Sequence, residues 1–164
     1  MTASVESIGR RRRLVRTYPT SLQHAWDLWT TPEGIARWWG PDGFHVEVQR
    51  MELRVGGTLE YWMVCDDPQI RAFLAREGMP ERQLAVIRYT EIVPLRRLAY
   101  ANVVDFVPGI EPYEAGTLVE LEPTAQGVQL TLTLDAMHDD AWTDRAVAGW
   151  QQELGKLARS IEEA

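Results

Sequence analysis

The sequence predicts an α+β domain in which a curved antiparallel sheet of about seven strands packs around a long C-terminal helix. Residues 128–135 alternate between apolar and polar side chains, as expected of a sheet with one buried face. Between residues 147 and 161, apolar side chains recur every three or four positions, which indicates a helix with one apolar stripe. A stripe of this length must be buried, and a one-sided sheet offers the matching surface.

The N-terminal part of the domain carries the first strand and two short helices. Residues 14–18 suit a strand, which Pro19 ends. Apolar residues at helical spacing follow, and either Thr20 or Ser21 is a good cap for the first helix. Thr31 and Pro32 form a second helix start, because proline fits the first helical position. We therefore expect two short helices directly after the first strand.

Six further strands complete the predicted sheet. They are expected at residues 44–53, 59–65, 84–93, 98–104, 117–122 and 128–135. Between the second and third of these, Asp67 is a cap, Pro68 fits the first helical position and Gly78 is a stop. The pattern predicts an extra short helix near residues 68–77. Its apolar side chains, Phe73 included, are expected either to cover a cavity mouth as a lid or to pack on the outside of the sheet.

Length and composition indicate one soluble folding unit. The chain of 164 residues suits a single domain, which we place at residues 12–164 after a flexible tail of residues 1–11. The net charge of −7 argues against a large nucleic-acid footprint, which needs a basic face. No apolar run approaches the roughly 18 residues of a membrane helix, and the basic N-terminus lacks the apolar stretch of a secretory signal. We therefore expect a cytoplasmic protein without nucleic-acid or membrane partners.

The residues that usually carry catalysis are sparse. No histidine has a second one at helical spacing, so we interpret His24, His45 and His138 as structural or solvated. Two acidic pairs precede helices, where capping explains them. The single cysteine, Cys65, excludes a cysteine-rich metal cluster. The sequence thus predicts no catalytic residue, no metal and no cofactor.

Several short stretches, taken in their order and spacing, carry a resemblance to a known family. They are Ala25-Trp26 with Trp29-Thr30, Ala36-Arg37-Trp38-Trp39-Gly40-Pro41 with Gly43-Phe44, Leu53-Arg54-Val55-Gly56-Gly57, Glu91-Ile92-Val93-Pro94 with Arg97-Leu98 and Tyr100, and Gly149-Trp150 with Leu154 and Leu157. Over roughly residues 12–163 the chain resembles the activator of the ninety-kilodalton heat-shock-protein ATPase homologues, within the START-like (SRPBCC, Bet v I-like) superfamily. The resemblance implies a helix-grip fold with a cavity between sheet and C-terminal helix. It implies no single reaction, because the fold serves many functions.

Aromatic residues come from every element expected to border that cavity. Apolar pockets with a few polar groups are the usual design for small-molecule sites. Arg88 and Asn102, on neighbouring strands, could supply polar contacts, although Arg88 also suits an exposed strand position; for Trp38 the alternative is plain core packing. The candidate ligand-binding residues are Trp38, Trp39, Phe44, Tyr61, Phe73, Arg88, Tyr100, Asn102, Phe106, Tyr113 and Trp150.

Three functions stay open at this level. The first is non-catalytic binding of a small, mostly apolar ligand. The second is an enzyme of the same fold, a cyclase or lyase acting on a hydrophobic substrate, which a buried titratable residue with a displaced pKa in the cavity would favour. The third is a chaperone-type interaction module with a large exposed apolar patch. The chaperone partner is less expected, because the co-chaperones of the family carry a separate domain before this one. The oligomeric state stays open.

Overall fold

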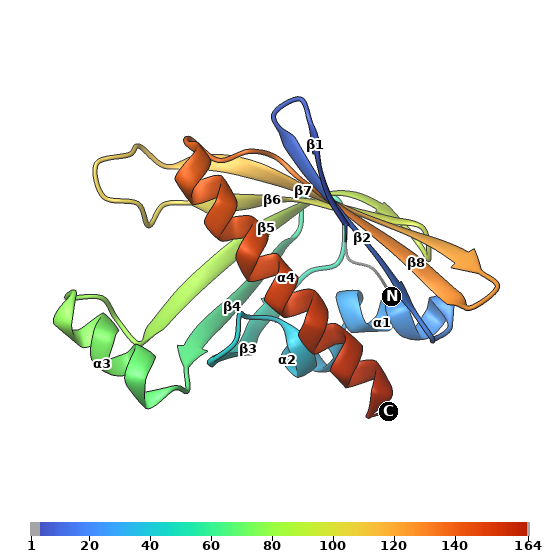
Figure 1. Cartoon of the computed structure of the whole chain (residues 1–164), viewed down its shortest axis with the longest axis horizontal. Helices are drawn as coiled ribbons and strands as arrows, with labels where there is room; N and C mark the ends of the chain where they lie inside the picture. Colours follow the sequence, from blue (N-terminus) through green and yellow to red (C-terminus); the bar gives the residue numbers. More distant parts are fainter. Residues whose placement is uncertain (1–3, 164) are drawn as a thin grey trace.

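A computed structural model describes residues 4–163, which form one curved antiparallel sheet and four helices. The strand order is β1-β2-β8-β7-β6-β5-β4-β3, and helix α4 runs diagonally across one face of the sheet (Figure 1). The strands are β1 (Ser4–Ile8), β2 (Arg11–Tyr18), β3 (Phe44–Met51), β4 (Thr58–Cys65), β5 (Arg82–Val93), β6 (Arg97–Val104), β7 (Tyr113–Thr124) and β8 (Gly127–Leu134); the helices are α1 (Leu22–Thr30), α2 (Pro32–Trp38), α3 (Pro68–Arg76) and α4 (Asp140–Glu162). The predicted α+β architecture is confirmed.

Strand β1 corrects the expectation of a flexible tail at residues 1–11. Ser4–Ile8 pairs with β2 in antiparallel register, and Val5 lies opposite Leu14. Val5 and Ile8 are both about two-fifths exposed, so this edge strand buries no face. A strand without a buried face shows no hydrophobic alternation, which is why the sequence did not indicate it. The sheet therefore has eight strands instead of about seven; residues 1–3 of the expected tail lie outside the described residues.

The two short helices after β2 begin at the expected caps. The Ser21 hydroxyl accepts a hydrogen bond of 3.0 Å from the His24 N–H, and the Thr31 hydroxyl accepts one of 2.9 Å from the Gly34 N–H. The indole N–H of Trp38 donates to the carbonyl oxygen of Leu28 at 2.8 Å and so joins α2 to α1. The bonds to Ser21 and Thr31 satisfy backbone N–H groups at the helix starts that have no partner within the helix.

Four tryptophans form the centre of the core. Trp29 and Trp38 meet edge to face at 4.6 Å between ring centroids, and Trp150 of α4 stacks on Trp29 at 5.7 Å. Trp39 contacts the same group at about 6 Å. Aromatic rings bury large areas and prefer such offset and edge-to-face arrangements. Trp38 is therefore a core residue, which was the alternative expected for it.

Helix α4 lies on the sheet by the predicted apolar stripe. Leu154, Leu157 and Ile161 are buried, and the Tyr18 hydroxyl of β2 donates to the Leu154 carbonyl oxygen at 3.1 Å. The Asp139 side chain caps the helix by accepting from the Trp142 N–H at 2.8 Å. No atom lies close to the Gly149 backbone, because a Cβ built at this position would meet nothing within 4 Å.

Helix α3 is present at the predicted place but does not cover the interior of the fold. Asp67 caps it by accepting from the Gln69 N–H at 2.8 Å, and none of its residues is buried. Its Ile70 side chain packs on Gly43, whose φ of +88° and lack of a Cβ allow this contact. Figure 1 shows α3 beyond the ends of β4 and β5, away from α4. The helix is an excursion beside the sheet.

None of the helices formed by residues 4–163 combines the length and the apolar character needed to cross a membrane.

Candidate functional site

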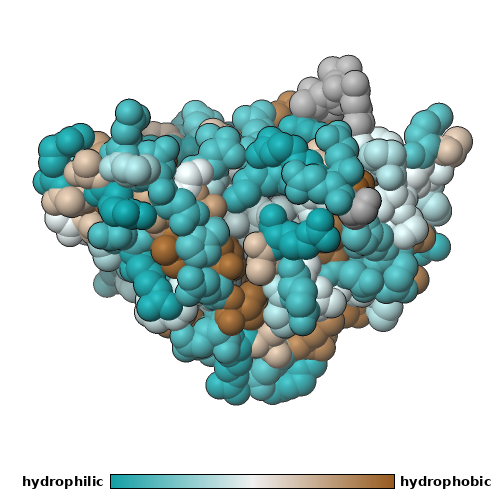
Figure 2. Space-filling model, turned by 90° about the horizontal axis from the view of Figure 1, so that it is seen from below, coloured by the Kyte–Doolittle hydropathy of each residue, from teal (hydrophilic) through white to brown (hydrophobic). Residues whose placement is uncertain are grey.

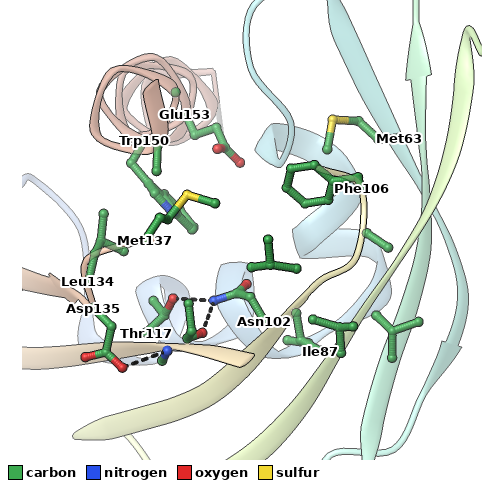
Figure 3. A pocket seen from close by; sticks show the side chains of 18 of the residues that line it. Met63, Ile87, Asn102, Phe106, Thr117, Leu134, Asp135, Met137, Trp150 and Glu153 are labelled. Carbon is green, nitrogen blue, oxygen red and sulfur yellow. Dashed lines mark hydrogen bonds between the residues drawn. The ribbon is translucent and has the colours of Figure 1, made fainter. Parts of the chain in front are cut away.

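A cavity of about 280 Å³ lies between α4 and the face of the sheet that α4 covers. Its walls come from β4, β5, β6, β7, the end of β8 and α4, and most of the lining is apolar (Figure 3). Ligand pockets commonly span about 300–1,000 Å³, and a cavity of about 150 Å³ is enough for benzene. The cavity therefore matches a small molecule with one or two rings.

Helix α4 presents one face to the cavity. Ala146, Gly149, Trp150 and Glu153 line it, and their spacing of three, one and three residues places them on the same side of the helix. Trp150 also belongs to the core stripe, so the cavity face and the stripe that lies on the sheet share this residue. The tryptophan thereby forms the boundary between the filled core and the cavity.

Asn102 supplies a fixed polar group on the sheet side. Its amide nitrogen donates to the carbonyl oxygen of Ala115 at 2.9 Å and to the Thr117 hydroxyl at 2.7 Å. Because a backbone carbonyl only accepts, these two bonds fix which end of the amide is nitrogen. The amide oxygen then remains as an acceptor, and Figure 3 shows the Asn102 side chain among the residues around the cavity.

Glu153 carries an acidic group that faces the cavity from α4 (Figure 3). One carboxyl oxygen accepts a hydrogen bond of 2.9 Å from the backbone N–H of Gly40. Burial raises the pKa of this carboxyl to about 7, against which the Gly40 hydrogen bond and the charge of Lys156 act only in part. Glu153 thus changes its charge near neutral pH.

Lys156 lies one turn from Glu153 but directs its ammonium group elsewhere. It donates to the carbonyl oxygens of Gly40 at 2.9 Å and of Phe44 at 3.1 Å. Burial lowers the pKa of Lys156, and the charge of Glu153 partly opposes this effect. No ion pair with Glu153 within 4 Å is present in residues 4–163. The lysine therefore ties the segment between α2 and β3 to α4 and does not neutralise the cavity carboxyl directly.

Two tyrosines stand close to Glu153. Tyr61 lines the cavity, and its ring meets Trp39 edge to face at 5.4 Å. Tyr100 is buried in the core, and its ring lies 6.1 Å from that of Trp39. Burial raises the pKa of both hydroxyls, and the negative charge of Glu153 raises them further. Both phenols are therefore neutral around neutral pH.

Asp135, the second acidic residue of the lining, already has partners. It accepts from the Gly116 N–H at 2.9 Å, and its other oxygen lies 3.3 Å from the guanidinium of Arg11. Glu153 and Asp135 are the charged side chains of the lining, and no lysine, arginine or histidine of the described residues belongs to it. The cavity is acidic and apolar.

The side chains opposite Trp150 and Glu153 come from the sheet and from the loop after β6. Phe106 lies there with Met63, and Phe106 is about half exposed (Figure 3). The ring of Phe106 also contacts that of Trp142 at 5.8 Å. Phe73, the expected lid residue on α3, is half exposed and does not line the cavity. The β6–β7 connection, and not α3, therefore borders the cavity.

The structure brings together four of the candidate residues at the cavity and places the others elsewhere. Tyr61, Asn102, Phe106 and Trp150 line it. The remaining candidates are core residues (Trp38, Trp39, Tyr100), a half-buried strand start (Phe44), an exposed helix residue (Phe73), an exposed strand residue paired with Glu114 at 2.7 Å (Arg88), and a tyrosine bonded to His138 at 2.7 Å (Tyr113). For Arg88, the exposed alternative is the observed one.

His45 forms a small acidic cluster outside the cavity. Its ring nitrogens lie 2.7 Å from Asp66 and 2.9 Å from Glu47, and the hydrogen bond with Glu47 is the main reason that the His45 pKa is raised. The cluster ties β3 to the start of the segment that carries α3. Across the described residues, no group of three or more His, Cys, Asp or Glu side chains is arranged to hold a metal ion.

Sequence reasoning missed Glu153, the chemically most distinctive residue of the cavity. It lies directly beside the apolar stripe, where a carboxylate ordinarily marks the solvent-facing edge of a helix. The available signal was its position three residues after Trp150, a candidate cavity residue, which puts both on one helix face.

Comparison with known proteins adds a family and a fold. Residues 19–162 match the model of the family described as "Activator of Hsp90 ATPase homolog 1-like protein". The comparison with curated proteins found no match.

Solved bacterial structures share the architecture. A protein from Chromobacterium violaceum is 24% identical with a TM-score of 0.77, covering 94% of this chain and 99% of its own. One from Arthrobacter aurescens is 18% identical with a TM-score of 0.78, covering 98% and 92%. An AHSA1-like protein from Aeromonas hydrophila is 20% identical with a TM-score of 0.73, covering 93% and 92%. These likenesses confirm the helix-grip fold.

Proposed function

The chain belongs to the Activator of Hsp90 ATPase homolog 1-like family, as the resemblance in its sequence indicated, and from this premise we propose that it binds a small, mostly apolar ligand in the cavity between the sheet and α4. The observation that carries the proposal is the cavity of about 280 Å³ with a largely apolar lining. The cavity opens to solvent, so its apolar lining is exposed to water. A ligand with an apolar body would remove that lining from water.

The lining gives the ligand an expected shape and polarity. Aromatic and aliphatic walls favour a ring system, while Asn102 and Glu153 offer a small number of polar contacts. Small-molecule sites typically combine an apolar enclosure with a few fixed polar groups that set orientation. The expected ligand is therefore a compound of one or two rings with one polar substituent.

Filling the cavity from α4 tests the proposal. Ala146 lines the cavity, so Ala146→Phe places a ring inside it, whereas Ala148 is exposed on the same helix and Ala148→Phe is the matched control. Calorimetric titration with naphthylmethanol should show binding to the wild type and to Ala148→Phe, and at least tenfold weaker binding to Ala146→Phe. Equal affinities for the two variants would contradict the proposed location. Should Ala146→Phe fail to fold, Ala115→Leu fills the cavity from the sheet side.

The second candidate function is an enzyme of the same fold, and Glu153 is the observation that favours it. A carboxyl whose pKa lies at about 7 within a cavity suits general acid–base chemistry. Tyr61, which lines the same cavity, is a neutral phenol whose hydroxyl could hold a substrate oxygen. Conversion of a bound hydrophobic ketone, followed by mass spectrometry and lost in Glu153→Gln, would support this alternative; ligands recovered unchanged would contradict it.

A chaperone-type partner stays a prediction, as does the expected lack of nucleic-acid and membrane partners. Exposed large apolar side chains include Val55, Phe73, Leu84 and Phe106. On the face of the molecule drawn in Figure 2, apolar residues are separated by hydrophilic ones. An interaction surface of this kind usually needs a contiguous apolar patch of several hundred Å². The cavity is the better supported site.

A further inference from the structure

The carboxyl groups and the free amide oxygen of the cavity accept hydrogen bonds, whereas the Tyr61 and Thr117 hydroxyls of the lining can both donate and accept. Both amide protons of Asn102 are used by Ala115 and Thr117, which leaves its oxygen as an acceptor. Asp135 is a carboxylate held by Gly116 and Arg11. Glu153 brings a second carboxyl group. A ligand with N–H donors therefore finds acceptors at Glu153 and Asn102.

Glu153 is the charged group in this set with unused hydrogen-bonding capacity. One of its oxygens accepts from Gly40, and no cation within residues 4–163 lies at ion-pair distance from the carboxyl. Lys156 is the nearest cation along α4, and its ammonium group donates to backbone carbonyl oxygens. A partly buried carboxylate without an ion-pair partner is costly to ionise, and a cationic ligand lowers that cost.

The surroundings of Glu153 suit an ammonium group. Trp150 and Tyr61 line the same cavity as Glu153, and Trp150 lies one turn before Glu153 on the same face of α4. Aromatic faces attract cations through the ring quadrupole, most strongly where water is excluded. The cavity thus combines a carboxyl group, an amide oxygen and aromatic rings, while its apolar walls accommodate the rest of the molecule.

We infer that the cavity selects small aromatic or aliphatic compounds that carry a protonated amine, whose N–H groups donate to the Glu153 carboxylate, and that it rejects compounds with a carboxylate. This inference rests on the proposed function, which it deepens by naming the ligand class. Binding forms an ion pair between the ammonium and Glu153. A carboxylate ligand instead meets the Glu153 carboxylate, a group of its own sign that has no ion-pair partner among the described residues.

Binding of a cation at Glu153 is coupled to the release of a proton from its carboxyl group. The groups that face Glu153 are Lys156 on α4, Tyr61 on β4 and Tyr100 on β6, and both phenols stay neutral around neutral pH. A cationic ligand binds the ionised form of Glu153. With a free-state pKa of about 7, affinity for the amine should be about tenfold weaker at pH 6 than at pH 8. At pH 6 nearly one proton should leave the protein for each amine bound.

Three compounds with one apolar body test the inference by calorimetry: naphthylmethylamine, naphthylmethanol and naphthoic acid. At pH 8 the amine should bind about tenfold to a hundredfold more tightly than the alcohol, and the acid more weakly than either. Titrations of the amine at pH 6 in two buffers of different ionisation enthalpy should show the proton release. The amine is protonated throughout this range.

Glu153→Gln keeps the shape and the Gly40 hydrogen bond but not the charge. It should remove the preference for the amine over the alcohol, the pH dependence of that preference and the proton release. Glu162→Gln, an exposed site on the same helix, is the matched control and should behave as wild type. If Glu153→Gln does not fold, the ratio of amine affinity to alcohol affinity and the proton release, both measured on the wild type, still test the inference.

The outcomes separate the two proposals. Alcohol binding as tight as amine binding, or an amine preference that persists in Glu153→Gln, overturns the inference and leaves the proposed function standing. Absence of binding by all three compounds overturns the proposed function, and the inference with it.

Discussion

The backbone N–H of Gly40 donates to the Glu153 carboxyl at 2.9 Å, so the segment that joins α2 to β3 holds the acidic side chain of the cavity. From the same helix, Lys156 donates to the carbonyl oxygens of Gly40 and Phe44. Through these bonds the segment contacts an acceptor and a donor of α4 that lie one turn apart, and the Asp42 N–H also donates to the Gln152 side chain at 3.0 Å. The position of α4 over the sheet and the state of the cavity carboxyl are linked through these hydrogen bonds.

The raised pKa of Glu153 predicts a pH-dependent cost in stability. The folded protein holds the proton up to a pKa of about 7, whereas the unfolded chain releases it near 4.5. Stability from this group is therefore complete below about pH 4.5 and is lost as the pH rises to about 7. In Glu153→Gln the loss should be absent, so the variant should gain about 2 kcal/mol relative to wild type between pH 5 and pH 8.

Urea unfolding at the two pH values measures this gain, since contributions from other groups cancel in the difference between variant and wild type. Glu162→Gln should show no such gain. A Glu153→Gln variant with the same pH dependence as wild type would mean that the carboxyl is solvated and titrates normally.

Leu154 tests the grip of α4 on the sheet. Its side chain is 1% exposed, so Leu154→Ala should lower the free energy of unfolding by about 2–5 kcal/mol. Leu53 is 40% exposed, and the same substitution there should cost well under about 1 kcal/mol. Equal, small losses at both positions, measured by chemical denaturation, would show that the stripe is not buried.

The two glycines of α4 separate helix stability from cavity shape. A methyl group at Gly149 meets no atom within 4 Å, and at Gly155 the nearest is the Arg159 guanidinium at 3.8 Å. Both alanine variants should therefore stabilise the protein, by up to about 1 kcal/mol each. Only Gly149 lines the cavity, so only Gly149→Ala should weaken ligand binding. Thermal denaturation with calorimetric titration checks both; equal effects of the two variants on binding would contradict the assigned lining.

The elements with one buried face were predictable from the sequence. Leu130, Leu132 and Leu134 alternate with threonines along β8, and the structure buries all three. Helix α3 was predictable for a different reason, since Asp67 and Pro68 specify a helix start locally. Strand β1 was not predictable, because an edge strand with polar residues shows neither hydrophobic alternation nor a local start sequence.

The candidate site was only partly predictable, because which residues face a cavity depends on how α4 is rotated over the sheet. Trp39 and Tyr100 lie on the expected side but are covered by their neighbours. Trp150 was placed correctly because it belongs to the stripe itself. The position of the Glu153 carboxyl at the cavity depends on the packing of α4 against Gly40, a contact between residues far apart in the sequence.

The central claim is that the cavity between α4 and the sheet binds a small apolar ligand, and titration of isotope-labelled protein with naphthylmethanol in amide and indole correlation spectra tests it most directly. The indole of Trp150 and the backbone amides of Gly149 and Asn102 should shift saturably. The indole of Trp62, which donates to Gln49 and lies under the Arg82 guanidinium, should not move. Shifts confined to Trp62 and its neighbours, or no saturable shift at any residue, would contradict the claim.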